Sequence, residues 1–368
     1  MGHYQFEIWL IILSFVLLLP RTRPVKLNVA SEYYRQNETP IAQRFLIFIF
    51  LFLGLLIILR DENIGNDTIE YVRSFNRYRI WDFNNRFEPG YNLLQSVTKI
   101  LSNNKFAILM SCGTITILLF YNFIKRYSKY YFLSIVFFVF LGFWGQSMNI
   151  IRQTLACAII AYSYSFLISN KLFKFIVSVL IASTFHSTAI LFLSAWFIKS
   201  IKLTTRNILY ALIGVIALYA SFSTVLQYTF MINDSYEGYS NSIFGEGNRT
   251  GALFQASCYV GLVIFALIIR NRAGVQTFRD NGLDTPFILC FIGAAILFMS
   301  YNMSIFGRIA QYFNIFQLIL LPNAIRLLKV KQQYVVTSLL FIYVNLFFWI
   351  TQILRPDWNR IFPYQTFL

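Results

Sequence analysis

Residues 44–60 read RFLIFIFLFLGLLIILR, and this stretch decides the fold class. Between the flanking Arg44 and Arg60 every residue is apolar, and only one of them is a glycine. The run approaches the roughly 20 residues that a helix needs to cross the hydrocarbon core of a bilayer. It therefore predicts a transmembrane helix over residues 44–59.

The rest of the chain repeats this pattern. The composition is 57% hydrophobic and only 12% charged, with a mean hydropathy of +0.59, which excludes a soluble enzyme. The first apolar stretch lacks the basic region and cleavage site of a signal peptide, so it is expected to be retained. Besides residues 44–59, the predicted full spans are residues 3–19, 105–124, 130–147, 151–168, 207–225, 252–269, 284–300, 306–324 and 334–352.

Positive charge predicts the orientation, because Lys and Arg concentrate in cytoplasmic loops. Alternate loops are basic and together carry 19 of the 31 Lys and Arg residues but only four acids, whereas the opposite side is nearly neutral. Both chain ends are therefore expected on the exterior. The basic loops are residues 21–44, 125–129, 171–174, 199–206, 270–279 and 326–331.

One apolar run, Leu172–Ile198, has lysines at both ends that should both be cytoplasmic. A hairpin of two short helices meeting at Phe185–Thr188 restores the alternation, and short discontinuous helices are tolerated where they line a protein cavity. The sequence therefore predicts an all-α polytopic membrane protein with about twelve segments. We expect one domain over residues 1–368, with exterior loops at residues 60–104, containing short helices at Ile69–Tyr78 and Tyr91–Leu101, and at 227–250.

Arginine and lysine are distributed differently. Nine of eleven lysines lie in the cytoplasmic loops, but the arginines divide equally between the two sides. The orientation rule does not explain exterior arginines in or beside membrane segments, such as Arg152 and Arg308, so their presence needs another explanation. One reason is phosphate binding, for which the planar guanidinium is well suited; the alternatives are interfacial snorkelling or a structural ion pair.

Polar neighbours accompany both arginines. Asn149, Arg152 and Gln153 are spaced to share one helix face, and Gln311 and Tyr312 follow Arg308 in the same way. An unpaired arginine within a span costs about 2.5 to 3.5 kcal/mol on insertion scales, so both should face a polar cavity.

Three further side chains are candidates for proton transfer or substrate positioning. His186 lies at the expected apex of the hairpin, where it serves as a base or a phosphate ligand, or is simply structural. Asp67 and Glu88 lie in the first exterior loop. The alternative role is a helix N-cap for Asp67 and a turn contact for Glu88. The loop aromatics, including Tyr71 and Tyr91, either stack on a substrate or form a membrane-interface belt.

Several classes of site are excluded by their missing motifs. The sequence has no HExxH, Walker A, GxSxG or Asp-x-Asp pattern, and its four cysteines form no CxxC pair. We therefore expect no metal site and no cofactor. No run of basic residues has the pattern of a nucleic-acid-binding surface either, so we expect no nucleic-acid partner.

The order of several short motifs resembles the EpsG family, which groups with Wzy-type polysaccharide repeat-unit polymerases of bacteria. The resemblance covers residues 61–326 and a tail at 358–364, although Ser187 stands where the family's pattern has a cation. The motifs are Gly65-x-Asp67-Thr68, Tyr71, Glu88-Pro89-Gly90-Tyr91, Asn149-x-x-Arg152-Gln153 with Ala156, Phe185-His186-Ser187-Thr188-Ala189, and Gly307-Arg308-x-x-Gln311-Tyr312-Phe313.

The resemblance implies a glycosyltransferase, similar in architecture to the GT-C class, at the outer face of the bacterial inner membrane. Its substrate would be an undecaprenyl-diphosphate-linked oligosaccharide that is built into O-antigen, capsule or another polysaccharide. Membrane lipid, a flippase and a chain-length regulator are candidate partners. For this reaction we expect the catalytic residues to be Arg152, His186, Arg308, Asp67 and Glu88, and the substrate-binding residues to be Asn149, Gln153, Gln311, Tyr312, Tyr71 and Tyr91.

Two other classes remain open from the residues alone. A flippase or transporter of lipid-linked oligosaccharides also needs arginines in a cavity, but such proteins usually show internal repeats, and none is visible here. A membrane acyltransferase would be expected to carry a histidine near its first spans, whereas His186 is central in the chain.

Overall fold

The computed structural model describes most of the chain: residues 40–83, 87–201, 249–301, 303–355 and 358–368, with Leu203, Thr204, Arg206, Asn207, Tyr210 and Ile213. The predicted span over residues 3–19 lies outside the described residues. The same holds for nearly all of residues 207–225 and 227–250.

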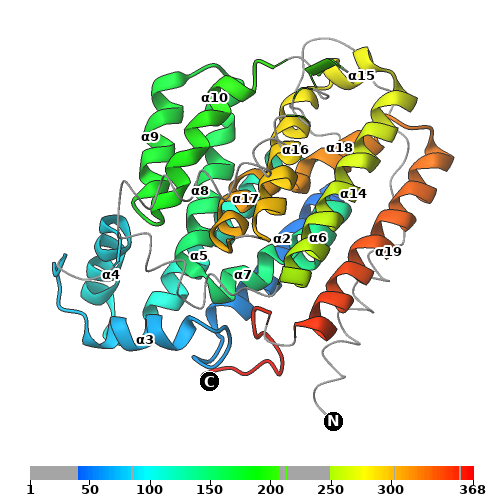
Figure 1. Ribbon diagram of the computed structural model, residues 1–368. Helices are drawn as coiled ribbons and strands as arrows, with labels where there is room; N and C mark the ends of the chain where they lie inside the picture. Colours follow the sequence, from blue (N-terminus) through cyan, green and yellow to red (C-terminus); the bar gives the residue numbers. More distant parts are fainter. Residues whose placement is uncertain are drawn as a thin grey trace. The chain divides into compact units, whose positions relative to one another are not determined.

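The described elements are helices, apart from one isolated backbone bridge between Arg60 and Thr366. This confirms the all-α class. In chain order the helices are α2 (Pro40–Ile58), α3 (Thr68–Arg77), α4 (Pro89–Leu101), α5 (Ala107–Tyr127), α6 (Tyr131–Phe140), α7 (Phe143–Asn149), α8 (Ile151–Ile168), α9 (Leu172–Ser183), the 3-10 helix η1 (Ser187–Ser194), α10 (Ala195–Ile198), α14 (Arg249–Ala273), α15 (Val275–Asp280), α16 (Asp284–Met299), α17 (Ile305–Asn314), α18 (Gln317–Ile325) and α19 (Val330–Leu354) (Figure 1).

Among the described residues, five helices are long and apolar enough to cross a membrane: α2, α5, α8, α14 and α19. The pair α6 and α7 forms a sixth candidate, bent by 45°. The chain is thus a polytopic membrane protein. The count of twelve segments stays a prediction.

Two predicted spans are not continuous helices. The span over residues 130–147 bends where α6 gives way to α7, because Gly142 adopts a left-handed conformation with φ of +89°. The span over residues 306–324 is divided between α17 and α18, where the Phe316 amide bonds to the carbonyl of Phe313, three residues back. In addition, α16 has 16 residues and is shorter than a full span.

The predicted break in the run Leu172–Ile198 is present. α9 ends at Ser183, and the chain turns through Phe185 and His186 before η1 begins. The second arm starts as a 3-10 helix rather than an α-helix, and becomes α-helical only over α10. α9, the helix before this break, packs along α8 (Figure 1).

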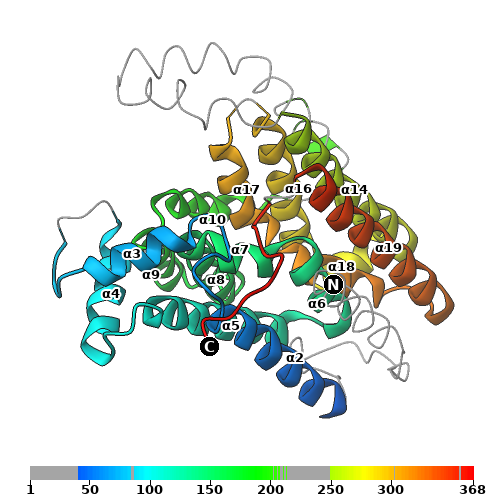
Figure 2. The same cartoon turned by 90° about the horizontal axis from the view of Figure 1, so that it is seen from below.

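The chain divides into two compact units, Met1–Ile190 with Gln317–Leu368, and Leu191–Phe316. In the first unit α5 packs between α2 and α8, and α6 packs on α18 and α19. Figure 2 shows α2 beside α5 from below. In the second unit α16 packs against both α14 and α17, and Phe192 packs on the rings of Phe313 and Phe316.

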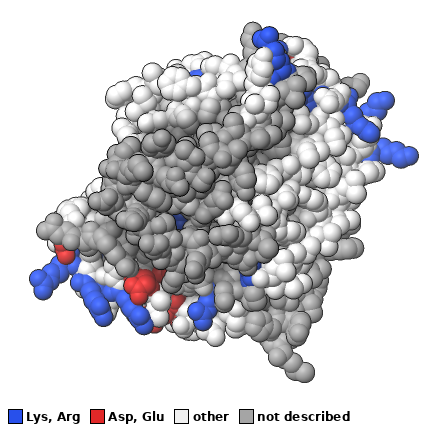
Figure 3. Space-filling view, in the orientation of Figure 1, with Lys and Arg blue, Asp and Glu red and all other residues white. Residues whose placement is uncertain are grey.

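Two amphipathic helices, α3 and α4, follow α2 within the predicted exterior loop. The Tyr78 hydroxyl joins them by donating to the carbonyl of Asn92 at 2.9 Å. Lys and Arg side chains gather with acidic ones on the surface over this part of the first unit (Figure 3). The helices begin one or two residues earlier than the sequence pattern predicts, at Thr68 and Pro89.

A C-terminal tail, residues 358–368, returns to the end of α2. The amide of Asp61 donates to the Gln365 carbonyl at 2.9 Å, and the amide of Phe367 donates to the Leu59 carbonyl at 3.2 Å. Figure 2 shows this tail in red, passing beside the chain that leaves α2. The tail thus fixes the segment that leads into α3.

Candidate active site

Arg152 lies in the first turn of α8, immediately after a break in the helix. α7 ends at Asn149, and Ile150 has non-helical backbone angles (φ −93°, ψ 62°). The prediction that Asn149, Arg152 and Gln153 share one helix face is therefore wrong, since Asn149 belongs to a different helix. A cation in the first turn also opposes the helix dipole, which favours negative charge there.

Three aromatic rings surround the Arg152 guanidinium. Its central carbon lies 4.7 Å from the ring centre of Phe87 and 5.8 Å from those of Tyr71 and Tyr91. The rings contact one another, with centres 5.2 to 6.1 Å apart. Cation–π attraction of about 0.5 to 2 kcal/mol per contact offsets the dipole effect. We call Tyr71, Phe87 and Tyr91 the aromatic cage.

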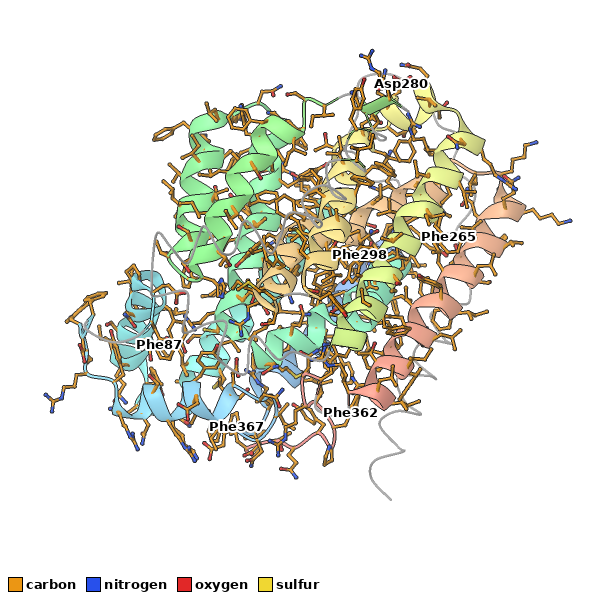
Figure 4. The ribbon with its side chains drawn as sticks, viewed as in Figure 1. Phe87, Phe265, Asp280, Phe298, Phe362 and Phe367 are labelled. Carbon is orange, nitrogen blue, oxygen red and sulfur yellow. The ribbon has the colours of Figure 1, made fainter. Side chains whose placement is uncertain are left out.

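The cage belongs to the buried core between α3, α4, α5 and α8. Figure 4 labels Phe87 beside α4 and Phe367 in the C-terminal tail, which packs against the same core. Tyr71 and Tyr91 are therefore buried around an arginine. Their predicted contact with substrate stays a prediction.

Glu88 completes the surroundings of Arg152. Its carboxylate pairs with Nη1 of Arg152, and each of the two side chains is 20% exposed. The other carboxylate oxygen accepts a hydrogen bond from the backbone amide of Ser187 at 3.3 Å. Glu88 stands at the N-cap position of α4 and makes no side-chain cap bond.

His186 occupies the turn between α9 and η1, as the sequence predicts, and is buried. Its Nδ1 lies 2.8 Å from the Thr188 hydroxyl, a local contact that orients the ring. Because the neighbouring Ser187 amide contacts Glu88, the hairpin apex and the Arg152–Glu88 pair form one assembly within the first unit.

Asp67 occupies the N-cap position of α3 without a side-chain cap bond, so its alternative capping role is not seen. The Asp67 amide donates to Asn149 Oδ1 at 3.0 Å, and the Thr68 hydroxyl donates to the Met148 carbonyl at 2.7 Å. Gly65 must be a glycine here, because its φ is +89° and a Cβ would lie 2.4 Å from that same carbonyl. The Gly65–Thr68 motif thus binds the start of α3 to the break between α7 and α8.

The Glu88–Arg152 pair is suited to a double-mutant cycle. We expect Glu88→Gln and Arg152→Met each to lower the free energy of unfolding by about 2 to 4 kcal/mol, because each leaves a largely buried charge unpaired. The double variant should lose less than the sum of the two. Thermal unfolding of the four purified proteins in detergent measures this coupling, and strictly additive losses would contradict the pairing.

Three of the remaining candidates lie in the second unit. Arg308 and Gln311 are partly exposed on α17, and Tyr312 is buried one residue further on. Gln153, by contrast, is in the first unit on α8, where it is buried. The structure thus joins Arg152 with Glu88, Tyr71 and Tyr91, and places Arg308, Gln311 and Tyr312 together on one helix.

Within the described ranges, no group of three or more His, Cys, Asp or Glu residues is placed to hold a metal ion. The described cysteines are free and buried. The side chains gathered around Arg152 carry guanidinium, carboxylate, imidazole and phenol groups.

Comparison with protein families decides the assignment: the sequence model of the EpsG family matches residues 43–366. The chain belongs to the EpsG family. This match includes every candidate site residue in both units, and EpsG membership indicates a Wzy-like polymerase related to glycosyltransferases. Neither a curated protein nor a solved structure matches the chain significantly.

For this EpsG protein, two contributions to the site region do not follow from the sequence motifs. The side chain of Arg60 is fully buried. The C-terminal tail anchors residues 59–65 through backbone hydrogen bonds. The sequence signal for Arg60 is its position, directly after an unbroken apolar stretch on the side where arginine is not required for orientation.

Proposed function

We propose that this protein is a polysaccharide polymerase that joins undecaprenyl-diphosphate-linked oligosaccharide repeat units at the outer face of the bacterial inner membrane. The observation that carries the proposal is the caged guanidinium of Arg152, which is partly exposed at a helix N-terminus beside a carboxylate and a histidine-bearing turn. Membership of the EpsG family supports the same reaction class.

The reaction needs a base and a group that stabilises the departing diphosphate. The acceptor sugar's hydroxyl oxygen attacks the anomeric carbon of the lipid-linked glycan, and the bond from that carbon to the diphosphate oxygen breaks. The diphosphate leaves with the electron pair, and the hydroxyl proton passes to a base. Preorganised donors directed at developing negative charge are usually the largest catalytic contribution.

Arg152 supplies such donors, and the positive end of the α8 dipole adds to its attraction for an anion. His186 is the proposed base or a further phosphate contact, and Asp67 or Glu88 positions the acceptor hydroxyl. Arg308 is proposed as a second cation for the diphosphate, on the sequence evidence. Asn149, Gln153, Gln311, Tyr312, Tyr71 and Tyr91 are the proposed substrate-binding residues.

The proposal includes the wider setting of the enzyme. We place the active site toward the periplasm or exterior, within a bundle of about twelve segments similar to that of GT-C glycosyltransferases. The broken α6–α7 pair and the short apolar helices before and after His186 support this, because discontinuous helices at membrane depth line protein cavities rather than lipid. A flippase and a chain-length regulator are the proposed protein partners.

Reconstitution tests the function directly. Purified protein in liposomes, supplied with lipid-linked repeat units extracted from cells that lack it, should produce a ladder of longer glycans on a gel. Arg152→Ala protein should produce none. Transfer of the labelled substrate across the bilayer without lengthening would replace the polymerase with a flippase, and absence of both would overturn the proposal.

A further inference from the structure

Arg60 is a fully buried arginine without a full set of hydrogen bonds. It follows α2 by two residues, and its side chain is 0% exposed. Nη1 donates to the carbonyl of Ile57, which caps the end of α2. Among the described residues, Nε and Nη2 have no hydrogen-bond partner. Leaving a buried charged donor unpaired costs more than the usual 1 to 3 kcal/mol of a neutral group, so these two nitrogens call for an acceptor.

The backbone around Arg60 is held independently of its side chain. Arg60 bridges to Thr366, and the neighbouring residues Leu59 and Asp61 bond to the tail. Phe367 of the tail stacks on Phe106 at 4.4 Å, and both rings pack against the core that contains the aromatic cage. The tail thus keeps Arg60 in place next to that core although two of its three guanidinium nitrogens are unbonded.

The charge of Arg60 acts on the same phenol as that of Arg152. Burial raises the pKa of Tyr91, while the positive charges of Arg152 and Arg60 both oppose that rise. Burial also lowers the pKa of Arg60 to about 10, which leaves the side chain charged at neutral pH. Both arginines therefore lie within electrostatic reach of the Tyr91 hydroxyl.

Most of the buried polar atoms near Tyr91 that lack a partner are donors; the exception on α4 is the side-chain oxygen of Gln95, one helical turn further on. Besides the two nitrogens of Arg60, these donors are Nε of Arg152 and the hydroxyl of Tyr91, which is buried and lacks a partner in the described part of the chain. Four unpaired donors from three side chains match a ligand that carries several acceptor oxygens. A phosphate group has this property, and arginine binds it in forked geometry.

We propose that Arg60, Tyr91 and Arg152 form one anion-binding site, with Arg60 as its buried second cation, and that this site takes a phosphate group. That the phosphate belongs to a lipid-linked glycan rests on the proposed function. Arg152 and Glu88 form the partly exposed side of this site. The anion therefore enters there and replaces the Glu88 carboxylate on the guanidinium.

Binding of inorganic pyrophosphate to the purified full-length protein tests the site. We expect calorimetry and thermal unfolding to show binding to the unmodified protein at constant ionic strength. Arg60→Lys and Arg60→Gln should weaken it at least about tenfold, as expected for loss of a charge-assisted hydrogen bond. Tyr91→Phe should weaken it by roughly threefold to tenfold. Arg73→Gln, which removes an exposed arginine paired with Glu70 on α3, should bind as the unmodified protein does.

Arg60→Lys and Tyr91→Phe separate ligand binding from folding. The Tyr91 hydroxyl makes no hydrogen bond within the described structure, so its removal leaves the fold intact even if the Arg60 variants do not fold. Unchanged pyrophosphate affinity in Tyr91→Phe and in folded Arg60→Lys would overturn the inference and leave Arg60 as a helix-end cap hydrated by water.

The polymer assay distinguishes this inference from the proposed function. Pyrophosphate binding that depends on Arg60, in a protein that makes no polymer from lipid-linked units, would support the anion site and overturn the polymerase proposal. Polymer formation by the unmodified protein, with pyrophosphate affinity unaffected by Arg60→Lys and Tyr91→Phe, would support the polymerase and overturn the anion site.

Discussion

Replacing Arg152 with Ala should lower glycan polymerisation at least about 100-fold, because removal of one preorganised donor to a developing anion typically costs 10² to 10³ in rate. Arg152→Lys should lower glycan polymerisation nearly as much. Lysine keeps the charge but loses the planar fork that contacts Glu88 and three aromatic rings together. The measurement is the length distribution of glycans on gels, from cells and from reconstituted protein.

The matched control for Arg152 is Arg77→Ala, which removes an exposed arginine at the end of α3. Its glycan ladder should be normal. Immunoblots of membranes must show equal amounts of all variants, so that lost polymer is not lost protein. Normal ladders from both Arg152→Ala and Arg308→Ala would remove the arginines from the mechanism and leave Arg152 a structural ion pair.

The sequence predicts features that depend on hydrophobic length and charge. The predicted span over residues 44–59 corresponds to α2, with its ends shifted by only a few residues. A membrane-spanning helix is the element that accommodates so long an apolar run. The break near His186 follows from lysines at both ends of one apolar stretch, a constraint that charge alone imposes. Both predictions use local information, which explains why they are confirmed.

The surroundings of Arg152 depend on tertiary contacts, so sequence spacing does not reveal them. Glu88 pairs with Arg152 across 64 positions of sequence, and the Ser187 amide approaches the same carboxylate from 99 positions away. The helix break at Ile150 separates Asn149 from Arg152, so the prediction from helix periodicity fails there. No proline or glycine in the sequence marks this break. The tail residue Thr366, which bridges to Arg60, is separated from it by an even longer stretch of sequence.

Gly90→Ala should disrupt the site although it changes none of the proposed catalytic groups. A Cβ on Gly90 would lie 2.1 Å from the hydroxyl oxygen of Thr184 and 2.9 Å from its carbonyl oxygen. The Gly90 amide also donates to that carbonyl at 2.8 Å, so α4 is seated directly on the end of α9. The Thr184 hydroxyl cannot turn away without losing its own bond to the Ile181 carbonyl.

We therefore expect α4 to shift in Gly90→Ala, which draws Glu88 away from Arg152 and from the Ser187 amide. The free energy of unfolding should fall by about 1 to 3 kcal/mol, as for other overpacked positions, and the glycan ladder should be lost. Thermal unfolding in detergent and the gel assay measure the two effects.

Gly307→Ala is the matched glycine control for stability, because its nearest neighbour would be Ser300 Cβ at 3.6 Å and it lies within α17. That variant should unfold at the same or a higher temperature, since alanine is favoured over glycine in a helix by roughly 0.5 to 1 kcal/mol. If Gly90→Ala were as stable as Gly307→Ala and made a full ladder, the close contact between Gly90 and Thr184 would not be needed to bring Glu88 to Arg152. The carboxylate would then be positioned by the aromatic cage and the guanidinium alone.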